Sequence, residues 1–222
     1  MNRFAIIVAG GSGSRMNAAT PKQFLLLSGQ PVLMHVLRAF HQFDAGIPIS
    51  LVLPAAQFDE WKRLCHEHHY TIPHSLINGG ETRFHSVKNG LASLKGDGIV
   101  AVHDGVRPFV SPELLKNCFE TAEKNGSAVP VLPLNESIRE KVQDKSKPVD
   151  RTRFLTVQTP QCFNLRKLQT AYETAYNDSF TDDASVFEFA GNEIYTVDGS
   201  RENIKITWPA DLAIAESLIK LR

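Results

Sequence analysis

The chain has 222 residues, 42% of them hydrophobic and 22% charged, which is the composition of an ordinary globular protein. Its 24 basic and 24 acidic residues give a formal net charge of +0, so we expect neither a nucleic-acid partner nor a membrane partner. No apolar run approaches the ~18 residues that span a bilayer, and the three cysteines are widely spaced, so we expect free thiols and a cytoplasmic location.

Predicted strands and helices alternate from residue 4 to residue 134. Short apolar runs predict strands at 4–9, 49–53, 76–80, 99–103 and 129–134. Apolar residues at helical spacing predict helices at 31–43, 58–64, 87–94 and 111–126. This alternation predicts an α/β fold with a Rossmann-like, mostly parallel sheet and helices on both faces. In such sheets, ligands bind at the carboxyl ends of the strands.

The first predicted strand runs into a glycine-rich loop. Three glycines within residues 10–13 allow a sharp turn and a close approach to a ligand, and the N–H groups of such a loop can bind an anion. Arg15 and Lys22 add two cations just after the glycines. No Gly-Lys-Ser/Thr follows, which excludes a P-loop, and Met16 stands where a dinucleotide fingerprint has its third glycine. The pattern alone leaves two interpretations, a phosphate site and a glycine turn without a ligand.

Residues 135–156 interrupt the alternation with a polar, highly charged stretch that is poor in large apolar residues. It is either a solvated loop or an extended arm that pairs with a second subunit. A long excursion from a compact domain is usually functional or disordered, and ordered-looking segments flank this one. We therefore expect an extended β-arm that is used for dimerisation.

Helices and strands resume after the arm. We expect helices at 165–176, 181–189 and 209–221, and strands at 194–197 and 204–207. The chain has no internal repeat and no linker that would split it. We therefore expect a single domain over residues 1–222, from which the arm protrudes at about 135–156.

Several motifs, in order along nearly the whole chain, carry a family resemblance. They are Gly-Gly-Ser-Gly-Ser-Arg-Met at 10–16 with Pro-Lys-Gln at 21–23, Gly-Gly-Glu-Thr-Arg at 79–83, His-Asp-Gly-Val-Arg-Pro at 103–108, Thr-Pro-Gln at 159–161, Thr-Asp-Asp-Ala-Ser at 181–185 and Asn-Ile-Lys-Ile-Thr at 203–207. This ordered set resembles the 2-C-methyl-D-erythritol 4-phosphate cytidylyltransferases, a nucleotidyltransferase family of the non-mevalonate isoprenoid pathway.

The resemblance implies a reaction and the residues that carry it. CMP would pass from CTP to the phosphate of methylerythritol phosphate, a small polyol phosphate, and pyrophosphate would leave. The resemblance implies that Arg15 and Lys22 neutralise charge at the α-phosphate, and that Arg151 and Lys205 hold the phosphate of the second substrate. It further implies Mg²⁺ as the cofactor, with Asp104 as its ligand, and a homodimer in which the arm reaches into the partner's site.

The remaining residues are assigned by the resemblance to substrate binding, with the loop glycines cradling the triphosphate. This set comprises Ala9, Gly10, Gly11, Ser12, Gly13, Ser14, Gly80, Arg83, Ser86, Asp104, Arg107, Ser137, Thr159 and Thr181. Arg83 has a structural alternative, since it could serve only as an ion-pair partner.

Three other functions stay open at this point. The Gly-Gly opening and the Val106–Phe109 segment also occur in the sister ribitol 5-phosphate cytidylyltransferases, which make CDP-ribitol. A nicotinamide-dependent reductase is a remote alternative, because the third glycine and the ribose-binding acid are missing. A nucleotide-binding regulator without catalytic activity is the third, since a fold does not fix a function.

Overall fold

Most of the strands belong to one central sheet. The computed structural model describes residues 1–10 and 20–221. The strands of its main sheet are β1 (Arg3–Val8), β4 (Ile49–Leu53), β5 (Ser75–Asn78), β6 (Ile99–Asp104), β7 (Ser127–Pro133), β10 (Leu155–Val157), β11 (Gln161–Asn164) and β12 (Thr196–Asp198). Two hairpins stand apart from it, β2 (Leu26–Leu27) with β3 (Gln30–Pro31) and β8 (Arg139–Val142) with β9 (Lys145–Pro148).

The order of strands in the sheet is β10–β7–β11–β6–β1–β4–β5, with β12 paired to β7. The pairs of β1 with β4, β1 with β6, β4 with β5 and β12 with β7 are parallel. This confirms the predicted α/β fold with a mostly parallel sheet. The pattern did not predict β10 and β11, which run antiparallel to their neighbours β7 and β6.

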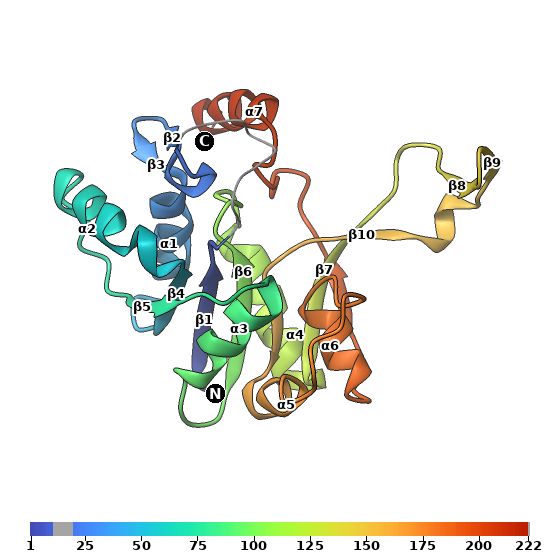
Figure 1. Ribbon diagram of the computed structural model, residues 1–222, viewed down its shortest axis with the longest axis horizontal. Helices are drawn as coiled ribbons and strands as arrows, with labels where there is room; N and C mark the ends of the chain where they lie inside the picture. The colour runs from blue at the N-terminus through green and yellow to red at the C-terminus, as the bar shows by residue number, and fades with distance from the viewer. Residues whose placement is uncertain (11–19, 222) are drawn as a thin grey trace.

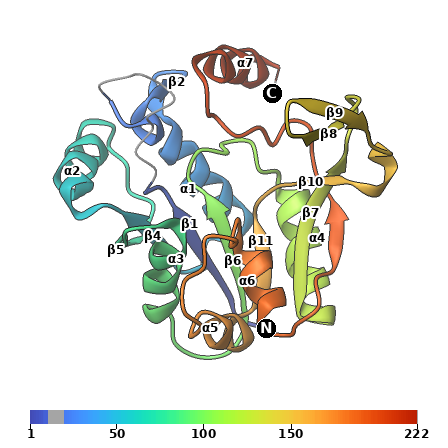
Figure 2. The same cartoon turned by 45° about the vertical axis from the view of Figure 1, so that its right-hand side comes forward.

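Helices cover both faces of the sheet (Figure 1). On one face α1 (Val32–Phe43), α2 (Phe58–Glu67) and α4 (Pro112–Asn125) share a core cluster with β1 and β4. On the other face α3 (Arg83–Ala92), α5 (Leu165–Ala171) and α6 (Asp183–Phe189) form a second cluster. The last helix, α7 (Pro209–Lys220), packs against the β2–β3 hairpin and lies beyond the carboxyl end of β1 in both views (Figure 2). Short 3₁₀ helices are η2 (Lys22–Phe24), η3 (Ala55–Gln57) and η4 (Arg151–Arg153).

The central position of β1 in the sheet explains why its sequence is a continuous apolar run. Ala5 and Ile7 pack into the first core cluster, and Phe4 and Ile6 pack into the second. A central parallel strand is buried on both faces and therefore needs apolar residues at every position.

The carboxyl ends of four parallel strands meet at one edge of the sheet. Val8 of β1 pairs with Val52 of β4 and with Asp104 of β6, while Leu53 of β4 pairs with Asn78 of β5. The segments that follow these strands therefore gather along the same edge, where a ligand site is expected.

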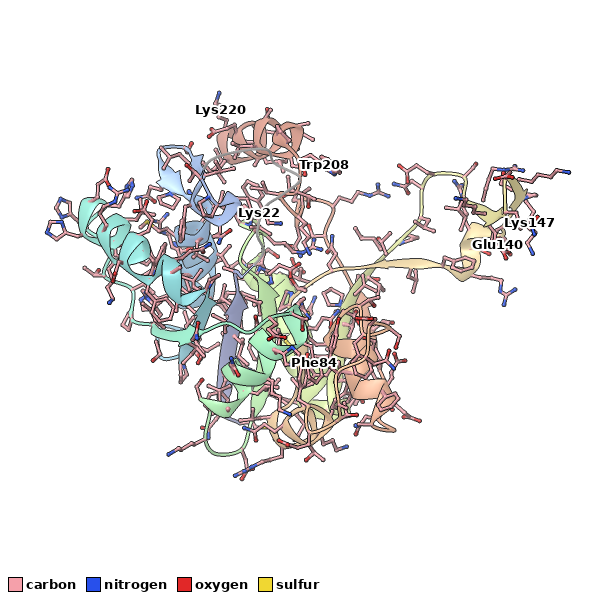
Figure 3. The ribbon with its side chains drawn as sticks, in the orientation of Figure 1. Lys22, Phe84, Glu140, Lys147, Trp208 and Lys220 are labelled. Carbon is pink, nitrogen blue, oxygen red and sulfur yellow. The ribbon has the colours of Figure 1, made fainter. Side chains whose placement is uncertain are left out.

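The predicted arm leaves the body of the molecule after β7 and returns at β10 (Figure 1). It carries the β8–β9 hairpin, across which Lys147 pairs with Glu140 at 3.0 Å near the tip (Figure 3). Both hairpin strands are exposed along their whole length. Among the described residues, no helix is long and apolar enough to cross a membrane.

In the C-terminal third, one predicted strand was wrong and one predicted helix was too long. Residues 204–207 alternate Ile-Lys-Ile-Thr but form no strand, because they run beside the loop after β6, where the N–H of Ile206 donates to the carbonyl of Val106 at 2.9 Å. The helix predicted at 165–176 ends at Ala171, and Tyr172, its C-cap, is buried in the core. The strand predicted at 194–197 is present as β12.

Gly90 sets how closely α3 can approach the sheet. A Cβ added there would lie 2.8 Å from Cγ2 of Ile6 and 3.2 Å from Cγ2 of Val52. We expect Gly90→Ala to lower the free energy of unfolding by about 1–2 kcal/mol, since overpacking outweighs the gain in helix propensity. Denaturant unfolding measures this change. Gly46→Ala is the control, because the nearest atom to its new Cβ is 3.4 Å away, and equal stability of the two variants would contradict the expectation.

Candidate active site

Two cavities open side by side at the edge where β1 and β6 end. The first, of about 360 Å³, is lined by Val8, Ala9, Gly10, Lys22, Gln23, Gly80, Glu81, Thr82, Arg83, Ser86, Asp104, Val106 and Lys205. The second, of about 270 Å³, is lined by Arg83, Asp104, Arg107, Val157, Gln158, Thr159, Gln161, Thr181, Asp182 and Lys205. Three charged side chains, those of Arg83, Asp104 and Lys205, belong to both linings and form the wall between the cavities.

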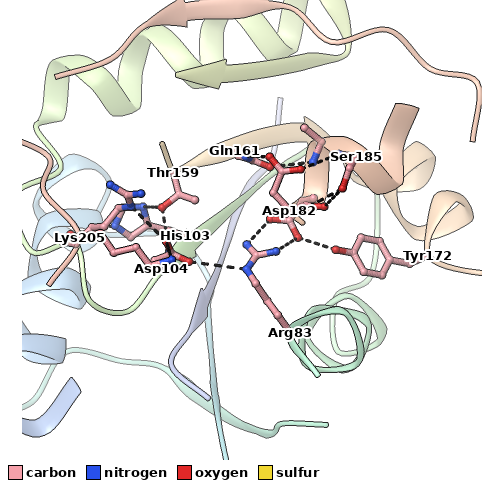
Figure 4. Close-up of polar contacts among 12 residues, drawn as sticks. Arg83, His103, Asp104, Thr159, Gln161, Tyr172, Asp182, Ser185 and Lys205 are labelled. Atoms are coloured by element: carbon pink, nitrogen blue, oxygen red, sulfur yellow. Dashed lines mark hydrogen bonds and ion pairs between the residues drawn. The ribbon is translucent and has the colours of Figure 1, made fainter. Parts of the chain in front are cut away.

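Asp104, the last residue of β6, is the centre of this wall (Figure 4). Nζ of Lys205 lies 2.9 Å from its Oδ2, and Nε of Arg107 lies 3.3 Å from the same oxygen. Nε of Arg83 faces its Oδ1 at 3.9 Å. Burial alone would raise the pKa of Asp104, but the three cations, Arg83 foremost, bring it well below its usual value. The carboxylate is therefore ionised at neutral pH.

A chain of hydrogen bonds holds the backbone of Asp104 in place. Its N–H donates to Oγ1 of Thr159 at 3.1 Å, and Thr159 in turn donates to Nδ1 of His103, also at 3.1 Å. The other ring nitrogen of His103 donates to the carbonyl of Arg107, which fixes the tautomer because a carbonyl only accepts. Burial lowers the pKa of His103 to about 4, so this ring is neutral.

Asn203 orients the segment that carries Lys205. Its side-chain Nδ2 donates to the main-chain carbonyl of Thr159 at 2.8 Å. The main-chain carbonyl of Asn203 accepts from Nη1 of Arg107, also at 2.8 Å. Both contacts are buried. Asn203 lies in the motif that suggested Lys205, but the direction of its side chain cannot be predicted from that motif.

Gln23 orients the segment that carries Lys22, on the other side of the first cavity. It is fully buried, and its Nε2 donates to the carbonyl of Ala9 and to Oε1 of Gln57, both at 2.8 Å. These bonds tie η2, and with it Lys22, to the end of β1. Gln23 belongs to the Pro-Lys-Gln motif at 21–23, but the motif does not indicate that its side chain is part of the site.

The loop before α3 forms the third side of the first cavity. Oγ of Ser86 accepts from the N–H of Gly80 at 3.1 Å and donates to the carbonyl of Thr82 at 2.9 Å. A Cβ at Gly80 would lie 2.4 Å from Cβ of His85, so only glycine fits this turn.

Arg83, predicted to bind substrate, is held by a carboxylate of the protein. Its Nη1 and Nη2 donate to the two oxygens of the buried Asp183 at 2.9 and 2.6 Å. Burial opposes the charged form, but Asp183 more than compensates, and the pKa of Arg83 is raised. The sequence placed Asp183 in a motif without a partner, because the two residues are far apart along the chain.

The structure brings together most of the predicted site residues that it describes. The first cavity contains Ala9, Gly10, Lys22, Gly80, Arg83, Ser86, Asp104 and Lys205, and the second adds Arg107, Thr159 and Thr181. Ser137 and Arg151 line neither cavity; both are exposed on the arm, where Arg151 donates to the carbonyl of Asn135. Five others, Gly11, Ser12, Gly13, Ser14 and Arg15, lie outside the described residues.

The donor set at this site fits a divalent cation that arrives with a ligand. No group of three or more His, Cys, Asp or Glu side chains comes together in residues 1–10 and 20–221. Mg²⁺ is often held by only one or two carboxylates and completed by substrate phosphates. The ionised carboxylate of Asp104, which lines both cavities, meets that requirement.

An α/β sheet whose strands end in two adjoining, cation-lined cavities suits an enzyme that joins two phosphorylated substrates, as a nucleotidyltransferase does. The family model for 2-C-methyl-D-erythritol 4-phosphate cytidylyltransferase matches residues 4–221. The chain belongs to this family.

Named relatives resemble the chain over its whole length. It is 52% identical to the 2-C-methyl-D-erythritol 4-phosphate cytidylyltransferase of Phocaeicola vulgatus, over 99% of this chain and 100% of that protein. It is 50% identical to the enzyme of the same name from Bacteroides thetaiotaomicron, with the same coverage. The crystal structure of the enzyme of that name from Thermus thermophilus superposes with a TM-score of 0.82 at 30% identity, over 99% of this chain and 100% of that one.

The hydroxyl of Thr159 connects two buried groups, and its loss should be measurable as stability. We expect Thr159→Val to lower the free energy of unfolding by about 1–3 kcal/mol, because Nδ1 of His103 and the N–H of Asp104 lose their partner. Thermal or denaturant unfolding measures the loss. Thr156→Val removes an exposed hydroxyl from β10 and should change the stability by less than about 0.5 kcal/mol; equal effects of the two variants would refute the buried network.

Proposed function

We propose that the protein transfers CMP from CTP to 2-C-methyl-D-erythritol 4-phosphate, giving 4-diphosphocytidyl-2-C-methyl-D-erythritol and pyrophosphate. A phosphate oxygen of the polyol phosphate attacks the α-phosphorus of CTP and forms a new P–O bond. The bond between the α-phosphorus and the bridging oxygen breaks, and pyrophosphate leaves with the electron pair. The attacking phosphate is already ionised near neutral pH, so the step needs alignment and charge neutralisation rather than a general base.

The observation that carries this proposal is the wall formed by Arg83, Asp104 and Lys205 between the two cavities. Two phosphorylated substrates that react with one another must lie in adjoining compartments with cations at the junction. The first cavity, with Lys22 and the backbone of Gly10, suits the nucleotide. The second offers the cation Arg107 with hydroxyls for the polyol phosphate, those of Thr159 and Thr181.

Within this reaction we assign Lys22 and Arg15 to the α-phosphate and the leaving pyrophosphate, and Lys205 to the junction of the two substrates. The backbone and hydroxyls of the glycine loop cradle the triphosphate. Mg²⁺, held by Asp104 and the phosphates of CTP, supplies additional charge neutralisation when bound.

The family resemblance of the chain does not favour the alternatives. The relatives with about half of their residues identical carry the name of the methylerythritol enzyme. Ribitol 5-phosphate remains useful as a competing substrate in the assay, because it presents the same phosphate on a different polyol.

We further propose a homodimer in which the arm of one protomer completes the second cavity of its partner. Arg151 and Ser137 are exposed on the arm, away from the cavities of their own chain. Large apolar side chains at the base of the arm are also exposed, among them Phe154 and Leu155, at 46% and 51%. A cover for such surface is expected, and a second copy supplies it.

The domain organisation and the cellular location are also proposals. We treat residues 1–222 as one domain with a protruding arm. The cytoplasm suits its three cysteines, because Cys65, Cys118 and Cys162 are all free thiols.

Pyrophosphate release tests the proposed reaction directly. With CTP and Mg²⁺ present, we expect turnover when methylerythritol phosphate is added and at least about tenfold less with ribitol 5-phosphate, since a site built for one polyol leaves polar groups unpaired with another. Preferred turnover of ribitol 5-phosphate would overturn the substrate assignment. No release with either would overturn the proposed activity.

Two lysine variants show whether a contaminating enzyme contributes to the activity in this assay. Lys22→Ala should lower kcat by about 10²–10³, the usual cost of removing a group that stabilises transition-state charge. Lys62→Ala, on the exposed face of α2, should leave turnover unchanged.

Mixing two inactive variants tests the shared site. Arg151→Ala and Lys205→Ala should each be nearly inactive as homodimers. Coexpressed in equal amounts, they should regain about a quarter of the wild-type activity, because half of the dimers are mixed and each has one complete site. Activity that stays at the level of the separate variants would contradict a site shared between protomers.

A further inference from the structure

Arg83 stands between two carboxylates that contact it in different ways. Nη1 and Nη2 of its guanidinium donate to Oδ1 and Oδ2 of Asp183 at 2.9 and 2.6 Å. Its Nε faces Oδ1 of Asp104 from 3.9 Å, which is beyond hydrogen-bonding distance (Figure 4). Asp183 therefore holds the guanidinium, whereas Asp104 only faces it.

Asp183 is itself fixed from behind. Its side chain is 0% exposed, and its Oδ1 also accepts from the hydroxyl of Tyr172 at 2.6 Å. The ring of Tyr172 is buried and stacks on Phe84, the residue after Arg83, with 4.7 Å between ring centroids. The ion pair locks the start of α3 against the start of α6, and the stacked rings lock it against the end of α5.

The two oxygens of Asp104 are used unequally. Lys205 and Arg107 both bind Oδ2. Within the described part of the chain, the hydrogen bonds to this carboxylate end on that oxygen. Among residues 1–10 and 20–221, Oδ1 is the oxygen left for a divalent cation, and Arg83 is the charged side chain that faces it.

We infer that Asp183 is a positioning residue that holds Arg83 away from Oδ1 of Asp104 and thereby keeps this oxygen available to a divalent cation. The inference rests on the proposed function, because it presupposes that a cation reaches Asp104 together with CTP. It assigns Asp183 and Tyr172 a part in the reaction although neither lines one of the two cavities.

The physical reason is that an arginine keeps its charge in a protein. The charged and titratable groups that act on Arg83 are Asp183, Asp104 and Tyr172. Once Asp183 is neutral, the carboxylate of Asp104 is the strongest partner that remains. A shift of roughly 1 Å brings Nε within hydrogen-bonding distance of Oδ1, and Arg83 then competes with the cation for this oxygen.

The test is how strongly Mg²⁺ tightens the binding of CTP. Calorimetric titration of CTP into the protein, once with saturating Mg²⁺ and once with EDTA, gives two dissociation constants, and their ratio measures the coupling between metal and nucleotide. We expect Asp183→Asn to lower this ratio by roughly tenfold, within the range found for residues that support a metal ligand. Its CTP affinity in EDTA should stay within about threefold of wild type, since Asp183 does not line the first cavity and Lys22 is unchanged.

A double variant separates positioning from mere structural support. Asp183→Asn combined with Arg83→Met removes both the anchor and the cation that would collapse onto Asp104. We expect this variant to recover at least the wild-type ratio. If Asp183 only held α3 against α6, the double variant would be as impaired as Asp183→Asn or more so, and the inference would be overturned.

Two further variants keep the test decisive. Tyr172→Phe removes one hydrogen bond and keeps the charge of Asp183, so it should fold even where Asp183→Asn does not; we expect a two- to threefold lower ratio. Asp97→Asn breaks a comparable but exposed pair with Arg166 and should leave the ratio unchanged. Equal loss of CTP affinity with Mg²⁺ and with EDTA, in both Asp183→Asn and Tyr172→Phe, would overturn the inference.

Failure of the proposed function gives a different result. In that case the wild-type protein shows no effect of Mg²⁺ on CTP binding and releases no pyrophosphate, which overturns the inference as well. Failure of the inference alone leaves the wild type coupled and active, while Asp183→Asn matches it.

Discussion

The structure depends most on the burial of one ionised carboxylate, that of Asp104. A charge removed from water is costly unless opposite charges and hydrogen bonds compensate for it. Three cations meet that demand, and each comes from a different part of the chain: Arg83 from α3, Arg107 from the loop after β6, and Lys205 from the segment before α7. Helix α3, the loop after β6 and the C-terminal segment therefore have to converge on the end of β6 before this carboxylate is stable.

Because folding brings these cations together, the overall composition of the chain does not indicate which ligands it binds. The chain as a whole has a formal net charge of +0. The walls of the two cavities nevertheless bring cations from distant parts of the chain to a single strand end, where the acids Asp104 and Asp183 hold several of them in place. A local cluster of cations suits phosphate groups, and it arises from folding rather than from amino-acid content.

The sequence predicted the parallel part of the fold well, because strands buried on both faces read as continuous apolar runs. It missed β10 and β11, which are short, and β11 is half polar with its pairing decided by distant strands. The alternating residues 204–207 were misleading for a related reason: strand-like alternation forms no strand without a neighbouring strand to pair with. Motifs located the cations of the site, since these residues stand together with glycines and prolines in the sequence. They could not reveal the residues that orient the cations, such as Gln23 and Asp183, because that role depends on side-chain direction and on partners far away in the chain.

These orienting residues share a physical purpose. A reaction that proceeds by alignment and charge neutralisation gains only from charges that are already in position when the substrates bind. Long side chains such as arginine and lysine lose rotamer entropy when they are fixed, so their position has to be enforced by buried partners. His103 with Thr159 on one side of the wall, and Asp183 with Tyr172 on the other, are hydrogen-bonded groups that enforce it. A hydrogen-bonded buried network is rigid, which accounts for polar residues such as His103, Thr159 and Asp183 that this protein keeps inside its core next to the site.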